Sequence, residues 1–588
     1  MCGIHAVIAL KTATDDSSNG HDNGNTSTPI EPLSEVLHTR LARRGPDHFG
    51  QVNSSFAGQD GGKTADLRFT STVLALRGDG LTPQPFEEPS TGRVLCWNGE
   101  VWRFDGAGDK HDEVDGNDGQ QLFDRLKACV DTPGVLNVLR AIEGPFAFVY
   151  YDRPTGQLYY GRDRLGRRSL LERRTDDTLT LSSVSDVSPS SSSDNPWVEV
   201  EADGIYMVDL QQERPFASTS SDAPGGTTRY DWSDETVVDG DAIVSGLGRF
   251  NMDSVPPPDD ARLTLDSPSV HQLREQLMAS LRLRVQNVPL PPSTTSSNGH
   301  PSRVTRIAVL FSGGLDCTVL ARMTHDLLPA DQGVDLINVA FENPRVVSHL
   351  KGDVTDIYEA CPDRITGRAS YAELQRACPS RKWRFVAVNV PYTETVAHRP
   401  EIVALMHPHN TEMDLSIGTA LYFASRAVSS TGETTETSAH HATSARVLLS
   451  GLGADELFGG YGRHTVAFSR DGGYSALASE LLLDVARLGR RNLGRDDRVL
   501  AHWGREVRFP FLDERLVRWA LALPVWAKCD FANTAGGDDG EPAKRVLRLV
   551  ALSLGMPNVA KEKKRAIQFG ARTAKMESGR VKGTALVA

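Results

Sequence analysis

The sequence has no apolar run long enough to span a lipid bilayer, and no basic region stands at Met1-Cys2-Gly3-Ile4. A transmembrane helix needs about 20 consecutive apolar residues, and a signal peptide opens with a basic segment. The seven cysteines are scattered, without the paired spacing of a metal site. We therefore expect no membrane association and reduced thiols in the cytosol or nucleus, with the cytoplasm as the predicted location.

Positive charge is also scarce. The chain has 64 Lys and Arg against 76 Asp and Glu, a formal net charge of −12, which argues against nucleic acid as the main partner. A hydrophobic content of 39% and a charged content of 24% are typical of a soluble globular protein. At 588 residues the chain is too long for one hydrophobic core, so we expect two or three domains.

A glycine turn dominates the second half of the chain. The apolar run Ile307–Phe311 meets Ser312-Gly313-Gly314, and apolar residues then recur at helical spacing. Backbone N–H groups in such a turn, together with a helix N-terminus, suit a phosphate or pyrophosphate. The turn has no lysine and lacks the P-loop spacing, which disfavours a P-loop NTPase. Asp316 would suit a Mg²⁺ ion on the phosphates, whereas the alternative is an ordinary strand-to-helix turn.

Further strands are predicted at 334–341, 385–390 and 447–449, with helical stretches between them. This alternation predicts an α/β fold with a doubly wound parallel sheet and ligands at the carboxyl ends of the strands. A second glycine turn follows the last of these strands and leads to Asp455, so Asp316 and Asp455 could share one Mg²⁺. The alternative makes Asp455 a solvated acid opening a helix. The basic run 561–565 could supply the phosphate-binding cation.

The chain starts with a second chemical candidate. Removal of Met1 would expose Cys2 with both a thiol and an α-amine, and an amine titrating at about 7.7–8.0 can act as the general base. Residues 3–10 read as a buried strand. Considered alone, Cys2 could equally be only the residue after the initiator.

Two further strands, predicted at 73–78 and 94–100, end in polar residues and glycine. Beside a thiolate, the side-chain amide of Asn98 and the N–H of Gly99 would form an oxyanion hole, although Asn-Gly is also a hairpin turn. The Arg44–Asp47 motif has two open interpretations: a rigid turn that shapes the pocket from outside, or a direct ligand of the substrate.

Seven motifs in the first 210 residues resemble, in order, those of the class II glutamine amidotransferase domain. They are MCGI, RRGPD, the arginine after LAL, WNGE, Asn117-Asp118, EGPFAFVYYD and GRDRLGRRSLL. The resemblance implies an Ntn-type αββα sandwich in which Cys2 attacks the side-chain amide of glutamine and releases ammonia. It implies that Asn98 and Gly99 hold the oxyanion. Arg77 would bind the glutamine carboxylate, and the α-amino end would be held by Gly99, Glu100 and Asp118.

The motifs SGGLDC, SGLGADELFGGY and GREVRFPFLD resemble those of the asparagine synthetase catalytic domain, from about Leu273 to Gly570. That family uses ATP and Mg²⁺ to adenylate a carboxylate and then admits ammonia. DRITGR and QFG extend the resemblance to the divergent asparagine synthetase domain-containing branch. The resemblance implies that ATP is lined by Leu310, Ser312, Gly313, Gly314, Asp316 and Cys317, with Val339, Ser450 and Gly451 at its adenosine part.

Two positions depart from the asparagine synthetase pattern. Leu452 stands where the family has a glutamate that serves the amidation step, and leucine cannot accept a proton. Ser416 stands where the family has an arginine that grips aspartate, and serine cannot form a bidentate pair with a carboxylate. Loss of such a pair is worth roughly 2–4 kcal/mol, on the order of a hundredfold in acceptor binding.

We therefore predict three regions: a class II glutamine amidotransferase domain at 2–210, a connector with disordered loops at 211–269, and an asparagine synthetase-like ATP-pyrophosphatase domain at 270–588. The hypothesis is a ligase that uses glutamine, ATP and Mg²⁺ to amidate a carboxylate, nominally aspartate. One alternative is another carboxylate acceptor. The other is a nucleotide-binding or regulatory protein without synthetase turnover. A homodimer is the candidate assembly.

Overall fold

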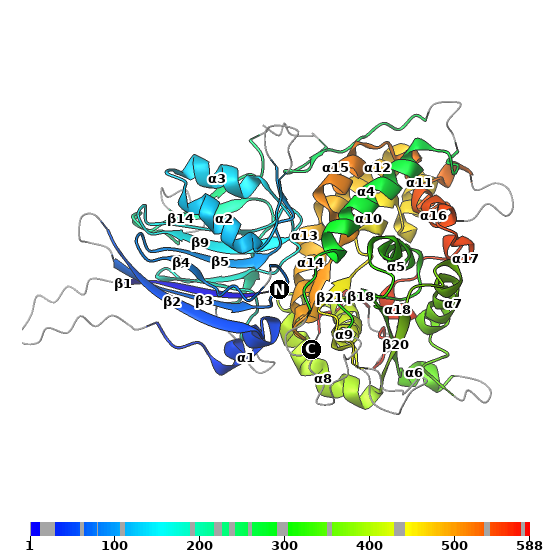
Figure 1. Ribbon diagram of the computed structural model, residues 1–588, viewed down its shortest axis with the longest axis horizontal. Helices are drawn as coiled ribbons and strands as arrows, with labels where there is room; N and C mark the ends of the chain where they lie inside the picture. The colour runs from blue at the N-terminus through cyan, green and yellow to red at the C-terminus, as the bar shows by residue number, and fades with distance from the viewer. Residues whose placement is uncertain are drawn as a thin grey trace, which may run out of the picture. The chain divides into compact units, whose positions relative to one another are not determined.

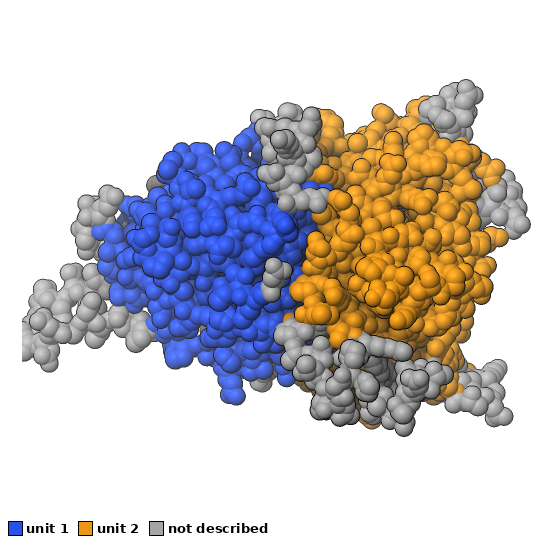
Figure 2. All heavy atoms as spheres, viewed as in Figure 1, with its two compact units in different colours: residues 1–234, 489–504 blue, residues 235–488, 505–588 orange. Residues whose placement is uncertain are grey.

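The computed structural model forms two compact units, residues 1–234 with 489–504 and residues 235–488 with 505–588 (Figure 2). Within the part of the chain that it describes, no helix is both long and apolar enough to cross a membrane. The described residues are 2–11, 30–58, 64–78, 80–105, 112–187, 195–216, 226–234, 242–256, 262–290, 304–349, 356–428, 442–533, 541–577 and 582–587. Within the connector predicted at 211–269, residues 217–225, 235–241 and 257–261 lie outside these ranges.

Unit 1 contains two six-stranded antiparallel sheets. The first has the order β13-β11-β12-β1-β3-β2 and the second the order β15-β14-β10-β9-β5-β4, while β7, β6 and β8 form a small third sheet. The bounds are β1 Gly3–Lys11, β2 His48–Ala57, β3 Thr64–Val73, β4 Phe86–Glu88, β5 Arg93–Gly99, β6 Arg103–Phe104, β7 Asp112–Glu113, β8 Ile142–Glu143, β9 Phe146–Asp152, β10 Gln157–Arg162, β11 Leu171–Arg174, β12 Thr178–Ser182, β13 Val198–Glu199, β14 Ile205–Asp209 and β15 Thr227–Tyr230.

The main core of unit 1 lies between these two sheets. Along β1, the side chains of Ile4, Ala6 and Ile8 alternate into this core and are fully buried, as the two-residue period of a strand requires. Helix α1 (Glu35–Arg44) covers the outer face of the first sheet, and α2 (Asp118–Lys127) and α3 (Thr132–Arg140) cover the second (Figure 1). The unit is therefore a sandwich of two sheets between helices.

A short segment from late in the sequence completes unit 1. Residues 489–504 carry most of α13 (Leu488–Arg491) and all of α14 (Leu493–Ala501). All nine residues of α14 are buried. No sequence pattern predicted this placement, since the segment lies inside the region assigned to the second domain.

Unit 2 is built on a five-stranded parallel sheet of order β20-β19-β18-β21-β22. The sheet grows outward in both directions from β18, which creates a switch point between β18 and β21. The strands are β18 Ile307–Leu310, β19 Val334–Phe341, β20 Trp383–Val390, β21 Val447–Leu449 and β22 Glu506–Arg508, and a separate hairpin joins β16 Ile243–Val244 to β17 Gly248–Arg249.

Helices make up most of the rest of unit 2 (Figure 1). They begin and end as follows: α4 Pro268–Val285, α5 Leu315–Leu327, α6 Pro344–Val347, α7 Pro362–Ala377, α8 Tyr392–Met406, α9 Glu412–Arg426, α10 Ala454–Phe458, α11 Gly462–Asp471, α12 Tyr474–Ala486, α15 Glu514–Ala522, α16 Arg545–Ser553, α17 Pro557–Ala560 and α18 Ile567–Gly570. Short 3₁₀ turns lie at Pro510–Leu512, Val525–Ala527 and Phe531–Asn533.

Most of the predicted strands are confirmed, but the strand predicted at 73–78 is wrong. Strand β3 ends at Val73, because the next residues leave the sheet and the N–H of Ala75 donates to Asp47 Oδ2 at 2.9 Å. The apolar run alone could not reveal this side-chain partner. Strand β22 was not predicted, since its three residues are too few to show a period.

Candidate active sites

Strand β1 holds Cys2 at one end of the sandwich core, where the residue is 8% exposed. The next residue cannot carry a side chain. A Cβ atom on Gly3 would lie 2.5 Å from Thr72 Oγ1, the atom that accepts a hydrogen bond from the Gly3 N–H at 3.0 Å. The backbone that leads to the thiol is therefore fixed against β3.

Asn98, on β5, is oriented by the backbone of Cys2. The backbone nitrogen of Cys2 donates to Asn98 Oδ1 at 3.0 Å. Because the amide oxygen accepts this hydrogen bond, the Nδ2 group of Asn98 faces away from the nitrogen of Cys2. Within the described residues, this fully buried Nδ2 finds no hydrogen-bond acceptor. A buried donor without an acceptor costs free energy, and an incoming oxygen would satisfy it.

Gly99 follows Asn98 at the end of β5 and packs tightly against β9. A Cβ atom here would lie 2.6 Å from Phe146 Cβ and 2.6 Å from the carbonyl oxygen of Pro145. The position excludes any side chain, which leaves the backbone accessible to a ligand. The hairpin alternative for Asn98-Gly99 is wrong, because both residues lie within a strand that pairs with β9.

Cys2 and Gly99 border a cleft that is partly open to solvent. Cys2 and Gly99 lie among its walls together with Arg77, Glu100 and Asp118, so the structure brings together the predicted glutamine-binding residues. The remaining walls are Val73, Leu74, Ala75, Leu76, Gly80, Thr82, Gln84, Trp97, Asn117 and Gly119.

The guanidinium of Arg77 is held from several sides. Its NH2 group donates to the carbonyl of Val114 at 2.8 Å, and its Nε lies 3.4 Å from Glu100 Oε2. The group also lies 5.4 Å from the ring centre of Trp102. A cation fixed in this way is suited to bind a substrate carboxylate.

Asp118 is the first residue of α2 and turns back toward β5. Its Oδ2 accepts hydrogen bonds from the N–H of Val101 at 2.8 Å and from Trp97 Nε1 at 3.3 Å. Burial raises the pKa of this carboxyl, and the charge of Arg77 opposes the rise. An ammonium group entering the cleft would favour the ionised form.

The Arg44–Asp47 motif lies against the backbone and is not among the residues that line the cleft. Arg44 Nε donates to the carbonyl of Cys2 at 3.4 Å, and Asp47 binds the N–H of Ala75. Of the two interpretations, this geometry favours a motif that shapes the pocket from outside.

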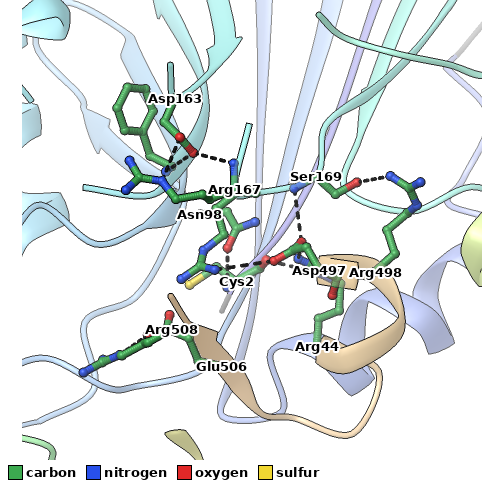
Figure 3. Close-up of polar contacts among 12 residues, drawn as sticks. Cys2, Arg44, Asn98, Asp163, Arg167, Ser169, Asp497, Arg498, Glu506 and Arg508 are labelled. Carbon is green, nitrogen blue, oxygen red and sulfur yellow. Dashed lines mark hydrogen bonds and ion pairs between the residues drawn. The ribbon is translucent and has the colours of Figure 1, made fainter. Parts of the chain in front are cut away.

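Helix α14 supplies the partner of Arg44 (Figure 3). Arg44 NH2 donates to Asp497 Oδ2 at 2.7 Å, and the same oxygen accepts the N–H of Ser169 at 3.1 Å. The next residue, Arg498, donates to Ser169 Oγ at 2.9 Å and to Glu199 at 2.6 Å. Ser169 belongs to the GRDRLGRRSLL motif, so this motif contacts α14 through hydrogen bonds.

In unit 2, the Ser312 turn has the geometry expected of a ligand-binding loop. Gly313 has φ +82°, and a Cβ atom on it would lie 2.5 Å from the backbone of Gly367 in α7. The Ser312 hydroxyl accepts the N–H of Gly314 at 3.3 Å and lies 3.6 Å from Cys317 Sγ. Gly313 is therefore required by its backbone conformation and close packing, whereas a Cβ atom on Gly314 would make only an ordinary contact, 3.4 Å from Ser312 Oγ.

The second glycine turn lies against the first. A Cβ atom on Gly451 would lie 2.8 Å from Asp316 Cβ. Ser450 lies in the same turn, and its hydroxyl accepts the N–H of Leu452 at 3.3 Å. Of the other predicted nucleotide residues, Leu310 ends β18, and Val339 lies on the neighbouring β19 with its side chain buried.

Asp316 and Asp455 share one cation in the structure, the ammonium of Lys544. Lys544 Nζ lies 2.7 Å from Asp316 Oδ1 and 2.9 Å from Asp455 Oδ1. Lys564, from the basic run 561–565, lies 2.5 Å from Asp455 Oδ2. Burial alone would raise the pKa of Asp455, but the two ammonium groups hold it well below its usual value. Burial would lower the pKa of Lys564, but the charges of Asp455 and Asp316 raise it. The alternative of a solvated acid at Asp455 is wrong, since this side chain is 10% exposed.

The same geometry tests whether a magnesium ion would fit here. Because the Lys544 ammonium lies between both carboxylates, an ion with Mg²⁺–oxygen distances of about 2.1 Å could bind both once that ammonium has moved aside. Two protein carboxylates with water and phosphate oxygens form a usual Mg²⁺ site. Within the described residues no group of three or more potential ligands occurs, so the phosphates would have to complete the coordination.

Lys544 and Asp497 were missed by the sequence analysis. Lys544 precedes α16 in a stretch without a motif, and it reaches Asp316 across 228 positions. Asp497 is one of several charged residues in 495–498, a pattern typical of a solvent-exposed helix. Only the burial of that helix reveals its role.

Of the two departures from the synthetase pattern, one lies at the second glycine turn and the other on helix α9. Leu452 follows Gly451, and no carboxylate stands at its position. Ser416 lies in the first half of α9, where its hydroxyl donates to the carbonyl of Glu412 at 2.8 Å. The N–H groups of Glu412 and Met413 donate to carbonyls of the carboxyl-terminal segment, Ala585 and Gly583, at 2.9 Å each. The start of α9 thus offers no cation to a carboxylate.

Comparison with known proteins shows which families match this sequence. Residues 302–473 and 467–585 match the family described as Asparagine synthase, and residues 1–220 match the Glutamine amidotransferase domain. The human Asparagine synthetase domain-containing protein 1 is 33% identical over 622 residues, which cover 93% of each chain. The chain belongs to the asparagine synthase family.

Other members of the asparagine synthase family are similar to this chain to different degrees. The Saccharomyces cerevisiae asparagine synthetase domain-containing protein is 31% identical and covers 96% of this chain and 93% of its own. The Gallus gallus Asparagine synthetase [glutamine-hydrolyzing] is 24% identical and covers 89% of this chain and 77% of its own. The predicted resemblance to this family is confirmed.

Proposed function

We propose that the chain is a ligase that hydrolyses glutamine at Cys2 and uses the ammonia, with ATP, to amidate a carboxylate. The proposal combines an Ntn-type glutaminase in unit 1 with a doubly wound ATP-pyrophosphatase unit. Family membership brings glutamine and ATP as the expected substrates.

In the glutaminase step, the neutral α-amine of Cys2 takes the thiol proton, after removal of Met1, and Sγ attacks the amide carbon of glutamine. The carbonyl oxygen becomes an oxyanion that Asn98 Nδ2 and the N–H of Gly99 stabilise. The ammonium of Cys2 returns the proton to the leaving nitrogen, so ammonia departs and a thioester remains. Water then hydrolyses the thioester to glutamate and restores the thiol.

One observation carries this proposal. The side-chain oxygen of Asn98 accepts a hydrogen bond from the nitrogen of Cys2, and its buried Nδ2 has no acceptor in the described chain. The cleft beside it also holds Arg77 and Asp118, which match the opposite charges of a glutamine α-carboxylate and α-ammonium. The nucleophile, Gly99 and the amino-acid clamp therefore line one cleft, and Asn98 is bonded to the backbone nitrogen of that nucleophile.

In the synthetase step, the acceptor carboxylate attacks the α-phosphorus of ATP and pyrophosphate leaves. Ammonia then attacks the acyl-adenylate, and AMP leaves as the amide forms. The backbone of the Ser312 turn is placed to bind phosphate oxygens, and Lys544 and Lys564 would neutralise the charge of pyrophosphate. Mg²⁺, held by Asp316 and Asp455, would supply further charge neutralisation there.

A specific observation favours an acceptor other than aspartate as the second candidate. The hydroxyl of Ser416 is bound within its own helix, and Leu452 supplies no base. An aspartate substrate needs a cation for its second carboxylate, and the two family groups that would serve it are replaced. The runner-up is therefore the same chemistry on a different carboxylate.

The test uses the full-length protein with glutamine, ATP and aspartate. Asparagine together with AMP supports the first candidate. Exchange of labelled pyrophosphate into ATP that requires a different acid supports the second. Ammonia release without ATP consumption under any acid would overturn the synthetase proposal and indicate a nucleotide-binding or regulatory role for unit 2.

A Cys2→Ala variant provides the matched control. It should lose glutamine hydrolysis while it retains any amide synthesis from added ammonia. Hydrolysis that persists in this variant would remove Cys2 from the mechanism.

A further inference from the structure

Gln84 lies beside the nucleophile, Cys2, and is not one of the predicted site residues. Its Nε2 group lies 3.7 Å from Cys2 Sγ, within the range of an N–H···S hydrogen bond. The side chain is buried, with the residue 6% exposed, and it lines the same cleft as Cys2 and Arg77. Gln84 therefore contacts the atom that would react.

The orientation of the Gln84 amide is fixed by its other end. The backbone N–H of Trp97 donates to Gln84 Oε1 at 3.1 Å. An N–H can bond only to the oxygen of the amide, so the NH₂ group must face the sulfur. Trp97 precedes Asn98 on β5, and the same strand thus orients two amides around Cys2.

The backbone of Gln84 is held as firmly as its side chain. A Cβ atom on Gly50 of β2 would collide with the carbonyl oxygen of Gln84, so the loop packs directly against bare backbone. A side chain anchored at both ends loses little further freedom when it binds the sulfur. Its donor is in place before the reaction starts.

We propose that Gln84 is a further catalytic residue, whose NH₂ group donates a hydrogen bond to the Cys2 thiolate. A donor stabilises the charged form of its acceptor, so the thiolate forms more readily when the α-amine takes the proton. When the thioester is hydrolysed, the same bond stabilises the departing sulfur. The role differs from that of Asn98 and Gly99, which would act on the substrate oxygen.

This inference rests on the proposed glutaminase, but its test does not need turnover. Alkylation of Cys2 by iodoacetamide is followed from pH 5 to 10, with the amino-terminal peptide quantified by mass spectrometry so that the other six cysteines do not interfere. Because the thiolate is the reactive form, the midpoint of the rate profile reports how readily the thiolate forms.

Gln84→Glu is the decisive variant, because it keeps the oxygen that binds Trp97 but places a carboxylate where the donor was. We expect the alkylation midpoint to rise by about one pH unit or more, since a negative charge replaces a donor. The kcat for glutamine hydrolysis should fall about tenfold or more, with a change of less than about threefold in KM.

Gln84→Leu removes both ends of the amide and should shift the midpoint upward by less. Gln51→Glu, on the exposed surface of β2, makes the same chemical change away from the cleft and should leave both readouts unchanged. Thermal unfolding of each variant verifies that it is folded, and Gln84→Glu alone suffices if the leucine variant is not.

An unchanged alkylation profile in folded Gln84→Glu would overturn the assignment. If the unmodified protein fails to hydrolyse glutamine, the proposed function fails, yet the profile still decides whether Gln84 acts on the sulfur. The two failures are therefore distinguishable.

Discussion

Asp497 accepts a hydrogen bond from the guanidinium of Arg44 at 2.7 Å, and both side chains are fully buried in unit 1. The two residues are 453 positions apart in the sequence. Because Arg44 also donates to the carbonyl of Cys2, a residue from late in the chain supports the backbone of the proposed nucleophile. The contribution of this support to the free energy of unfolding can be measured.

Asp497→Ala should lower the free energy of unfolding of unit 1 by about 3–5 kcal/mol, since it leaves the Arg44 guanidinium buried and unpaired. Asp497→Asn keeps an acceptor and should cost less. Urea denaturation measures both. The control is Glu201→Ala, which breaks the exposed pair with Arg490 and should change stability by about 1 kcal/mol or less. Equal effects of Asp497→Ala and the control would contradict the prediction.

Asn98→Ala should lower the kcat for glutamine hydrolysis by about 10²–10³, because it removes one oxyanion donor from the reaction. The KM for glutamine should change much less, since the amino-acid clamp is intact. Steady-state ammonia release measures both constants. Asn53→Ala on the exposed strand β2 is the matched control. A variant that affects KM alone would assign Asn98 to binding and not to the transition state.

Lys564→Met should destabilise unit 2 at neutral pH, and the loss should shrink as the pH falls below about 4. Burial would raise the pKa of Asp455, but Lys544 and Lys564 hold it below its usual value. A depressed pKa stabilises the fold above the unfolded-state pKa and loses this contribution in acid. Unfolding free energies at pH 7 and pH 3.5 test this, with the adjacent, 83% exposed Lys563 changed to Met as the control. A pH-independent loss would point to packing instead.

Asp363→Asn should make the protein more stable above pH 7. Burial raises the pKa of Asp363 to about 7, so the folded protein keeps a proton that the unfolded chain releases near pH 4. Stability therefore falls as the pH rises from about 4 to about 7, by at most about 4 kcal/mol, and is flat above that. The asparagine variant should lack this slope.

The pH dependence due to Asp363 is tested by measuring unfolding free energies from pH 4.5 to pH 8.5. Asp326→Asn, at a partly exposed helix position paired with Arg322, is the control and should retain the slope. A slope that survives in Asp363→Asn would assign the pH dependence to other groups.

The sequence predicted those features that depend on local pattern. Strand β19 and the turn at Ser312 follow from an apolar run and two glycines, and the structure places them as expected. The residues that line the cleft around Cys2 were also brought together as the motifs implied. Each of these signals lies within a few consecutive residues.

What could not be predicted depends on contacts between distant parts of the chain. Lys544 occupies the space between Asp316 and Asp455, and its neighbours in the sequence give no sign of this. Gln84 becomes important only because Trp97 fixes its amide beside Cys2. Long-range partners of this kind leave no periodicity in a single sequence.

The burial of helix α14 within unit 1 also bears on how the protein is made. A ribosome releases the chain from its amino terminus, and units complete their folding only when all of their residues have emerged. Because α14 ends at Ala501, the support beneath Cys2 is absent until the carboxylates and glycine turns of unit 2 have already been synthesised. Biosynthesis thus delays completion of the proposed ammonia-releasing pocket until most of the unit that would consume the ammonia exists.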